Sequence, residues 1–360
     1  MIKLNNFFIA SIDDLKNYEW FNKYKVPNEN LQINQDAYDA FWYFISERMN
    51  IFYKRVILEE EAPWTTDPLL QKYKFTNVIR DIDALTLYER QHILDKLDES
   101  TQDLDLRKKS VLLNIFIYRL WVKPDTYEVH GFIDLSNPNW KESWNKAKIK
   151  LLDRREKGIS NFTNAYFVCG LQKANPDKST RTNKTLNACY LIESWMDNMD
   201  EIYEQTIIKA KNMDEQLEYL RKLPYVGKFN AYEIACSIAI TSRYCKNPLV
   251  LWTQDNSTSV GPGAHKGLQF MFQNYGGLSE YELILYLRSI WKHELQQCGT
   301  YDRFITQLPK EMNGDIDLRV IEHCLCELQK YWKVKNGLGR PKISFKPSHD
   351  SKDLKLGLNV

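Results

Sequence analysis

The sequence predicts a mostly α-helical protein, and two observations carry this prediction. Apolar residues recur at helical spacing in residues 35–55, 280–295 and 317–331, so that each segment has one apolar face. Alternation of apolar and polar residues, which is typical of a half-buried strand, is confined to residues 127–135. No internal repeat of 20–50 residues is visible. We therefore expect helices along most of the chain, with one strand at most.

Composition narrows the class of protein. Of the 360 residues, 43% are apolar and 27% are charged, which is ordinary for a globular protein and too apolar for a disordered one. Lys and Arg exceed Asp and Glu by only two (49 against 47), so net charge indicates no partner. The longest apolar run, residues 111–122, is too short to span a bilayer, and no charged-then-apolar leader opens the chain. The seven cysteines lack paired spacing, which suits a reducing compartment. Secreted, membrane, fibrous and disordered classes are excluded, and we expect a cytoplasmic protein without a membrane partner.

Breaking residues divide the chain into segments. Asn-Pro pairs at 137–138 and 175–176 flank an ill-defined middle region, and a Gly-Pro-Gly bend at 261–263 interrupts the last third. Beyond residue 336 the chain is rich in glycine and lysine, as in an irregular basic arm. We expect four parts: an N-terminal extension (1–34), a helical lobe (35–200), a second helical lobe (201–335) and a basic C-terminal arm (336–360). The first lobe carries the segments of a candidate base pocket, and the second carries a helical hairpin; both are described below.

Polar side chains follow the first helical segment, in residues 63–83. Asp67 and Pro68 fit the N-cap and the first position of a helix. Asn77, Arg80 and Asp83 are spaced by three and can share a face of the next helix, where a solvated ion pair is the simpler interpretation. The alternative is a polar pocket, beside aromatic rings, that stacks on a nucleobase and binds its edge. The candidates for this pocket are Trp64, Thr65, Asp67, Phe75, Asn77, Arg80 and Asp83.

A tight turn joins two helical segments, residues 214–223 and 231–241. Gly227 allows the backbone to approach a ligand closely, and the first N–H groups of the second helix face outward, so the turn can hold a phosphate. On DNA such a turn anchors the backbone without reading the sequence. A purely structural helical hairpin is the alternative interpretation. The candidate DNA-binding residues here are Leu223, Pro224, Tyr225, Val226, Gly227 and Lys228.

Asp255 follows this hairpin and precedes the Gly-Pro-Gly bend. A simple helix N-cap is one interpretation of the residue. The other is a carboxylate that points into a cleft beside the DNA anchor and acts in catalysis. Gly261 and Gly263 of the bend are further candidates for DNA contact.

The last helical segment carries His323, Glu327 and Lys330 at positions i, i+4 and i+7, opposite its leucine face. A solvated helix face is the simpler interpretation. Alternatively, His323 and Glu327 line the base pocket, and Lys330 binds DNA together with Arg340 and Lys342 of the basic arm.

Metal and nucleotide motifs are missing from the sequence. Cys324 and Cys326 would point in different directions on a helix, so no metal site is expected. No Gly-x-x-x-x-Gly-Lys-Ser/Thr loop occurs, so the chain is not by itself a P-loop kinase, and no cofactor is expected.

Several of these segments together resemble one family. The resemblance is carried by Phe41-Trp42, Glu47-Arg48, Pro63-Trp64-Thr65, Asp67-Pro68, Phe75-Thr76-Asn77-Val78, Arg80, Val260-Gly261-Pro262-Gly263-Ala264, Glu322-His323, Leu325-Cys326-Glu327 and Lys330-Tyr331. Over residues 35–345 the chain is similar to the alpha-glutamyl/putrescinyl thymine pyrophosphorylase family, a group related to the helical domain of phage 5-hydroxymethyluracil DNA kinases. The resemblance implies the helix-hairpin-helix DNA glycosylase fold, two helical lobes with a cleft between them, and action on hypermodified bases in DNA.

We expect a monofunctional DNA glycosylase that removes a bulky hypermodified pyrimidine, such as a glycosylated one, from phage-type DNA. The expected partner is DNA with modified bases, no protein partner is evident, and the expected role is antiphage defence. Asp255 would stabilise the positive charge that develops on the sugar. Bifunctional enzymes of this fold place a Schiff-base lysine where Phe229 stands, so we expect abasic sites in intact strands.

Two alternatives stay open. One is a transferase in thymine hypermodification, which replaces an activated group on 5-hydroxymethyluracil in DNA with an amine or amino acid. In that case Arg48, Arg55, Arg80 and Lys330 would crowd a pocket for the pyrophosphate leaving group. The other is a non-catalytic DNA-binding module, in which Asp255 is only a cap.

Overall fold

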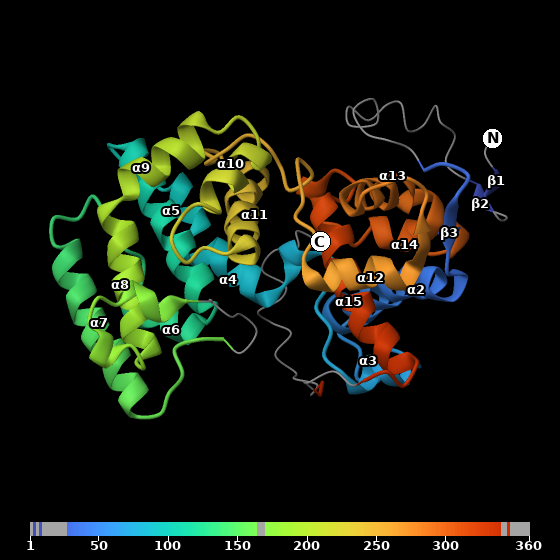
Figure 1. The fold of residues 1–360 in the computed structure, drawn as a ribbon, viewed down its shortest axis with the longest axis horizontal. Coiled ribbons are helices and arrows are strands. Elements are labelled where there is room, and N and C mark those ends of the chain that lie inside the picture. Colours follow the sequence, from blue (N-terminus) through green and yellow to red (C-terminus); the bar gives the residue numbers. More distant parts are fainter. Residues whose placement is uncertain (1–2, 5–6, 9–26, 164–169, 340–343, 346–360) are drawn as a thin grey trace. The chain divides into compact units, whose positions relative to one another are not determined.

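The computed structural model describes residues 3–4, 7–8, 27–163, 170–339 and 344–345 (Figure 1). Helices make up most of these residues and the strands are short, which confirms the prediction of a mostly α-helical protein. The chain divides into two compact units. Unit 1 comprises residues 1–83 and 258–360, and unit 2 comprises residues 84–257. The lobe boundaries at 34, 200 and 335 stay a prediction.

Unit 1 is built from helices at both ends of the sequence. Its elements are β1 (Lys3–Leu4), β2 (Phe7–Phe8), β3 (Leu31–Ile33), α2 (Gln35–Phe52), α3 (Pro68–Lys72), α12 (Pro262–Met271), β4 (Phe272–Tyr275), α13 (Glu280–Gln297), α14 (Tyr301–Ile305) and α15 (Leu318–Lys335). β1 pairs with β2, and β3 pairs with β4, both antiparallel. β3 precedes α2 and β4 follows α12. Their backbone hydrogen bonds therefore link the two sequence segments that make up unit 1.

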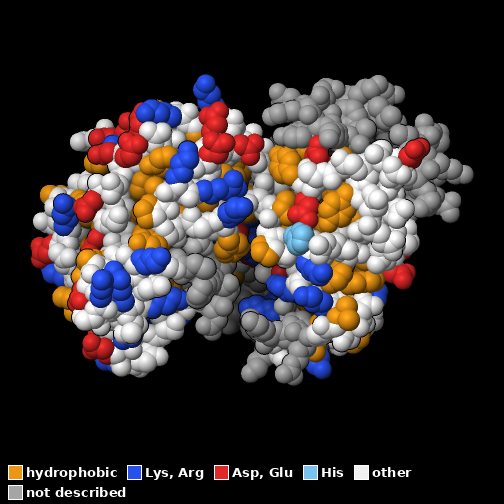
Figure 2. All heavy atoms as spheres, viewed as in Figure 1, with side chains coloured by type: hydrophobic (Ala, Val, Ile, Leu, Met, Phe, Trp, Pro, Cys, Tyr) orange, Lys and Arg blue, Asp and Glu red, His pale blue; other side chains and the backbone are white. Residues whose placement is uncertain are grey.

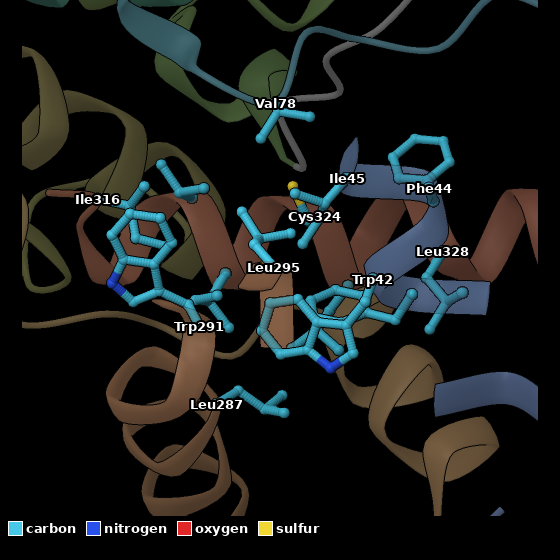
Figure 3. Close-up of a cluster of buried hydrophobic side chains, with 14 of the residues drawn as sticks. Trp42, Phe44, Ile45, Val78, Leu287, Trp291, Leu295, Ile316, Cys324 and Leu328 are labelled. Atoms are coloured by element: carbon cyan, nitrogen blue, oxygen red, sulfur yellow. The ribbon is translucent and has the colours of Figure 1, made fainter. Parts of the chain in front are cut away.

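One apolar core joins α2, α12, α13 and α15. Trp42 and Ile45 of α2, Leu295 and Trp291 of α13, and Cys324 and Leu328 of α15 belong to one cluster of buried side chains (Figure 3). These residues come from the three helical stripes that the sequence predicts. Packing of the stripes against one another removes their apolar faces from water, which is the main force that holds such helices together.

Two glycines bring α12 very close to α15. A Cβ added at Gly263 would lie 2.8 Å from the Sγ of Cys326, and one at Gly267 would lie 2.4 Å from the carbonyl oxygen of Leu325. A side chain at either position would therefore force the two helices apart. The close packing fixes the start of α12 against the middle of α15, where His323 lies.

Unit 2 is a helical bundle around a buried central helix. Its helices are α4 (Ala84–His92), α5 (Leu104–Trp121), α6 (Pro124–His130), α7 (Trp140–Glu156), α8 (Lys184–Asp197), α9 (Met199–Tyr203), α10 (Met213–Leu220) and α11 (Lys228–Tyr244). Every residue of α5 from Ser110 to Trp121 is buried. Within this core, Arg119 binds Glu89 at 2.5 Å, Glu233 at 3.1 Å and the hydroxyl of Ser237 at 2.6 Å.

Residues 127–135, the one segment considered for a strand, do not form one. Pro124 occupies the first position of α6 after an extended Lys123, so the first half of the segment is helical. In the second half, the side chain of Asn114 replaces a partner strand. Its Nδ2 donates to the carbonyl of Ile133 at 2.8 Å, and its Oδ1 accepts from the Ile133 N–H at 3.0 Å. A buried side-chain amide thus satisfies the backbone that a sheet would otherwise satisfy.

Charges of both signs are interspersed over the described surface on the face drawn in Figure 2, as the small net charge of the sequence suggests. Among the described helices, none combines the length and the apolarity that a membrane crossing requires.

Candidate functional site

Arg48 anchors the segment after α3 to α2. This arginine is on the last turns of α2, and it donates from Nε to the carbonyl of Thr76 at 3.3 Å. Its Nη2 donates to the carbonyl of Phe75 at 3.3 Å and to Oδ1 of Asn77 at 3.1 Å. Burial lowers the pKa of the Arg48 guanidinium, whereas the nearby carboxylates of Asp83 and Glu327 oppose this shift. Three acceptors on one guanidinium hold residues 75–77 in a single position.

Residues 77–83 form an irregular turn, so the expectation that Asn77, Arg80 and Asp83 share a helix face is wrong. Ile79 is extended, and only residues 80–82 form a short 3₁₀ turn. The Asp83 carboxylate closes this turn because it accepts from the backbone N–H of Asn77 at 3.3 Å and pairs with the Arg80 guanidinium. The three polar residues still meet, through these bonds. The ion pair between Arg80 and Asp83, which was the simpler interpretation of these residues, is present. It is largely buried rather than solvated.

α15 supplies the other side of this cluster. Nε2 of His323 and the hydroxyl of Thr76 share a hydrogen bond of 2.7 Å, and Oε2 of Glu327 accepts from the Thr76 N–H at 3.4 Å. The Lys330 ammonium binds Glu327 at 2.6 Å. A solvated helix face therefore does not describe Glu327, which is buried. The Arg48–His323 cluster consists of Arg48, Thr76, Asn77, Arg80, Asp83, His323, Glu327 and Lys330.

The electrostatics of this cluster keep His323 neutral. Burial lowers the pKa of His323 well below its usual value, and the positive charges of Arg80, Arg319 and Lys330 lower it further. A neutral imidazole surrounded by cations can form a hydrogen bond with an anion that these cations bind, and it does not carry a charge of its own. Sequence reasoning did not single out Arg319 or Thr76 as site residues. Arg319 lies four residues, or about one helical turn, before His323 on α15. This spacing in the sequence could have indicated that Arg319 lies near His323.

The remaining predicted base-pocket residues form a second group, around Asp67. Asp67 caps α3 by accepting from the N–H groups of Leu69 and Leu70 at 2.7 and 3.1 Å, as predicted, with Pro68 in the first turn. Its other carboxylate oxygen accepts from the hydroxyl of Tyr331 at 2.7 Å. The hydroxyl of Thr65 accepts from the Asp67 N–H at 3.1 Å.

The two rings expected to stack on a base are both buried in protein contacts. Trp64 donates from Nε1 to the carbonyl of Glu60 at 2.6 Å, and the Arg55 guanidinium lies 5.4 Å from its ring centroid. Phe75 packs edge-on against Phe44. Stacking of Trp64 or Phe75 on a base stays a prediction. Arg55 lies against Trp64 and is also close enough to Arg48 for its positive charge to lower the pKa of the Arg48 guanidinium.

A hollow of about 560 Å³ opens beside this second group, between α2 and α15. We call it the acidic groove, and its lining residues are Asp36, Asp39, Ala40, Tyr43, Asp67, Tyr331, Trp332, Lys335 and Asn336. Apart from Asp67, sequence reasoning missed these residues as site candidates. The spacing of Asp36, Asp39 and Tyr43, three and four residues apart on one helix, was an available signal.

The hairpin lies in unit 2, where a tight turn joins α10 to α11. Its left-handed residue is Tyr225, with φ of 63°, whereas Gly227 has φ of −71° and serves as the N-cap of α11. A Cβ at Gly227 would meet nothing within 4 Å, and Lys228 and Phe229 are exposed. The turn is thus open to a ligand. Its contact with DNA, through Leu223, Pro224, Tyr225, Val226, Gly227 and Lys228, stays a prediction.

Asp255 also belongs to unit 2. It lies in a turn held by its neighbours, since Gln254 Nε2 donates to the carbonyl of Cys236 at 2.9 Å and Asn256 Oδ1 accepts from the N–H of Met213 at 2.8 Å. The N-cap of α12 is Gly261, so Asp255 does not cap that helix. The Arg48–His323 cluster belongs to unit 1, so the two sets of candidate residues are parts of different units.

The other predicted DNA contacts fall in unit 1. A Cβ at Gly261 would lie 3.5 Å from Oε1 of Glu322, and Gly263 faces Cys326. Close helix packing therefore accounts for the glycine at position 263. Lys330 is exposed beside Glu327. Arg340 and Lys342 lie outside the described residues.

Comparisons with known proteins show the family to which this chain belongs. The family model for the helical domain of 5-hmdU DNA kinases matches residues 35–339, and the chain belongs to this family. A relative, the 5-hmdU DNA kinase of Bacillus phage SP10, is 36% identical over 332 residues, which cover 90% of this chain and 50% of the relative. The chain thus spans about half the length of the curated relative that it matches. No solved structure matches.

These findings overturn the glycosylase prediction. A kinase is a transferase that moves a phosphoryl group, whereas a glycosylase is a hydrolase that removes a base, and both matches are kinases by name. The predictions that depended on glycosylase activity, namely hydrolysis at Asp255, an abasic product and a role in antiphage defence, are therefore withdrawn. The resemblance to the 5-hydroxymethyluracil DNA kinase helical domain is confirmed, and the transferase alternative agrees better with the findings.

Proposed function

We propose that the chain takes part in the hypermodification of thymine in DNA, as a transferase that acts on the 5-hydroxymethyl group of 5-hydroxymethyluracil. Its closer kinship would be with the alpha-glutamyl/putrescinyl thymine pyrophosphorylases. In this reaction an activated hydroxymethyl group, carried as a pyrophosphate ester, is replaced by an amine or amino acid. The bond from the methylene carbon to the pyrophosphate oxygen breaks, pyrophosphate leaves with the electron pair, a C–N bond forms, and the amine loses a proton.

The observation that supports this proposal most strongly is the set of cations around His323. Arg48, Arg80, Arg319 and Lys330 all act on this part of unit 1, and together they suit a pyrophosphate leaving group. The family match adds DNA with modified thymine as the class of substrate. Residues 1–360 have no Gly-x-x-x-x-Gly-Lys-Ser/Thr loop, so the part proposed for this chain is one that needs no P-loop.

Nucleoside analysis by mass spectrometry tests the proposal. DNA that carries 5-hydroxymethyluracil, or its pyrophosphate ester, is incubated with the protein and a mixture of amines and amino acids, or with ATP. A nucleoside heavier by the added amine, together with released pyrophosphate, is the expected result. Phosphorylated 5-hydroxymethyluracil in the ATP reaction would contradict the assignment of amine transfer in favour of kinase activity. Binding of DNA without any new nucleoside would contradict both assignments.

A lysine variant tests the assigned site. Lys330→Gln is expected to lower kcat/KM for the pyrophosphate ester by up to about fivefold, because one partly exposed cation near the leaving group is lost. Lys333→Gln, three residues further along α15, is the matched control and should leave the rate unchanged. Equal rates for the two variants would remove the Arg48–His323 cluster from the reaction.

A further inference from the structure

Arg55 lies in an irregular turn at the end of α2. Residues Tyr53–Ile57 continue α2 as a π-helical turn, and Arg55 is the third residue of this turn. Such turns are rare, and they are frequent at functional sites. The side chain of Arg55 is half-buried and reaches the ring of Trp64. The end of α2 thus brings a second arginine, after Arg48, to the same side of unit 1.

The segment of Ser344 and Phe345 binds to this part of unit 1 from far away in the sequence. Ser344 forms an antiparallel bridge with Tyr73, and the N–H of Phe345 donates to the carbonyl of Lys72 at 2.9 Å. The ring of Phe345 packs against the apolar core of the unit. The segment lies beyond residue 339, where the match to the family model ends. Its position is therefore a feature of this chain that the family match does not cover.

The guanidinium of Arg55 contacts two aromatic rings at once. Its central carbon lies 5.4 Å from the ring centroid of Trp64 and 5.8 Å from that of Phe345. The two rings meet edge to face, with centroids 6.2 Å apart and 67° between their planes. Trp64 is fixed in turn by its bond to the carbonyl of Glu60 at 2.6 Å. Each ring attracts a cation at such distances, so both restrain Arg55. We call Arg55, Trp64 and Phe345 the aromatic clamp.

The clamp affects the charge near the Arg48–His323 cluster. The positive charge of Arg55 lowers the pKa of the Arg48 guanidinium, so the two groups are close enough to repel each other. An arginine that is repelled and has a long, flexible stem would move towards solvent if nothing restrained it. Two guanidinium groups held near each other attract a phosphate more strongly than one does.

We propose that Phe345 is a positioning residue, which together with Trp64 holds the Arg55 guanidinium near Arg48 and so raises the affinity of the Arg48–His323 cluster for a phosphate ester. Phe345 acts through Arg55. The inference rests on the proposed function for the identity of the anion. It goes beyond that function because it makes the affinity of the cluster depend on a residue outside the family match.

The side-chain dynamics of Arg55 in the full chain test the clamp without any ligand. The Nε–H signal of Arg55 is assigned by its loss in Arg55→Lys. Its order parameter should be above about 0.8 in the wild-type chain and in Phe345→Tyr, and below about 0.6 in Phe345→Leu, because leucine keeps apolar volume but has no aromatic face. Equal order parameters in the wild-type chain and Phe345→Leu would overturn the proposal.

Affinity for inorganic pyrophosphate, measured by calorimetry, tests the consequence for the cluster. Phe345→Leu should weaken binding about threefold to fivefold, since one partly exposed cation is no longer held near the anion. Phe345→Tyr should keep the wild-type affinity. Phe270→Leu is the matched control, because Phe270 is also a half-buried ring of unit 1 and has the ammonium of Lys266 at 5.2 Å from its centroid. This variant should leave the affinity unchanged.

Failure of the clamp and failure of the proposed function give different results. Loss of order at Arg55 in Phe345→Leu without a change in pyrophosphate affinity would overturn the inference and leave the proposed function intact. Equal weakening in Phe345→Leu and Phe270→Leu would indicate a general loss of packing and would overturn the inference as well. A wild-type chain that binds no pyrophosphate would contradict the proposed function, and the role of Phe345 in anion binding with it.

Discussion

Replacement of Arg48 by methionine is expected to destabilise unit 1 strongly. Methionine fills much of the volume of the arginine stem but removes all its donors. The three hydrogen bonds to Thr76, Phe75 and Asn77, at 3.1–3.3 Å, would each cost about 1 kcal/mol. Asp83 and Glu327 would also lose a neighbouring cation in a buried setting. The expected loss in the free energy of unfolding of unit 1 is therefore about 3–5 kcal/mol.

Hydrogen exchange resolves this loss, because a chain with two compact units need not unfold in one step. Amide exchange in α15 of unit 1 should accelerate at least about a hundredfold, the equivalent of about 3 kcal/mol. Exchange in α5 of unit 2 serves as the internal reference and should stay unchanged. Arg303→Met, which removes an exposed bond to Asn50, is the matched variant and should have little effect. Less than a threefold change in α15 of Arg48→Met would refute the reasoning.

Three further outcomes follow from buried contacts. Gly267→Ala should lower the stability of unit 1 by about 1–3 kcal/mol in urea titrations, because its Cβ would lie 2.4 Å from the carbonyl oxygen of Leu325, and a neutral result would contradict the close packing. Burial raises the pKa of Glu294 from 4.5 to about 7, so the folded state favours its protonated form. The stability from Glu294 is complete below pH 4.5 and is lost as pH rises towards 7, by at most about 3 kcal/mol, and Glu294→Gln should flatten that slope in unfolding curves. Arg119→Met should cost unit 2 about 3–5 kcal/mol in thermal or urea unfolding, and addition of Glu89→Gln should recover part of the loss, since one stranded carboxylate is removed.

Helix positions could be predicted from the sequence because they depend on local periodicity. Residues 35–55, 280–295 and 317–331 have apolar faces wide enough to require a partner, and they become α2, α13 and α15. The cap at Asp67 was equally accessible, since an N-cap followed by proline depends on two adjacent residues.

Features that depend on distant residues could not be predicted. Residues 76–83 are held by bonds from Arg48 to Asn77 and from His323 and Glu327 to Thr76, and these bonds override the spacing by three that suggested a helix. Likewise, Asn114 replaces a strand partner for Ile133 from nineteen residues away. The acidic groove is lined by residues of α2 and α15, which are almost three hundred residues apart in the sequence. No local sequence pattern predicts which of their charges lie near each other.

Unit 1 takes its helices from both ends of the chain, and this has a consequence for biosynthesis. Ribosomes deliver α2 long before α13 and α15, and at about 5–20 residues per second the interval is on the order of 10–60 s. During that time Trp42 and its apolar neighbours on α2 lack their partners on α13 and α15. Unit 2, residues 84–257, is contiguous and can fold as soon as it emerges. We expect the nascent chain to hold a finished unit 2 while α2 still lacks α13 and α15, which makes it a client for chaperones that shield apolar helices until these two helices emerge.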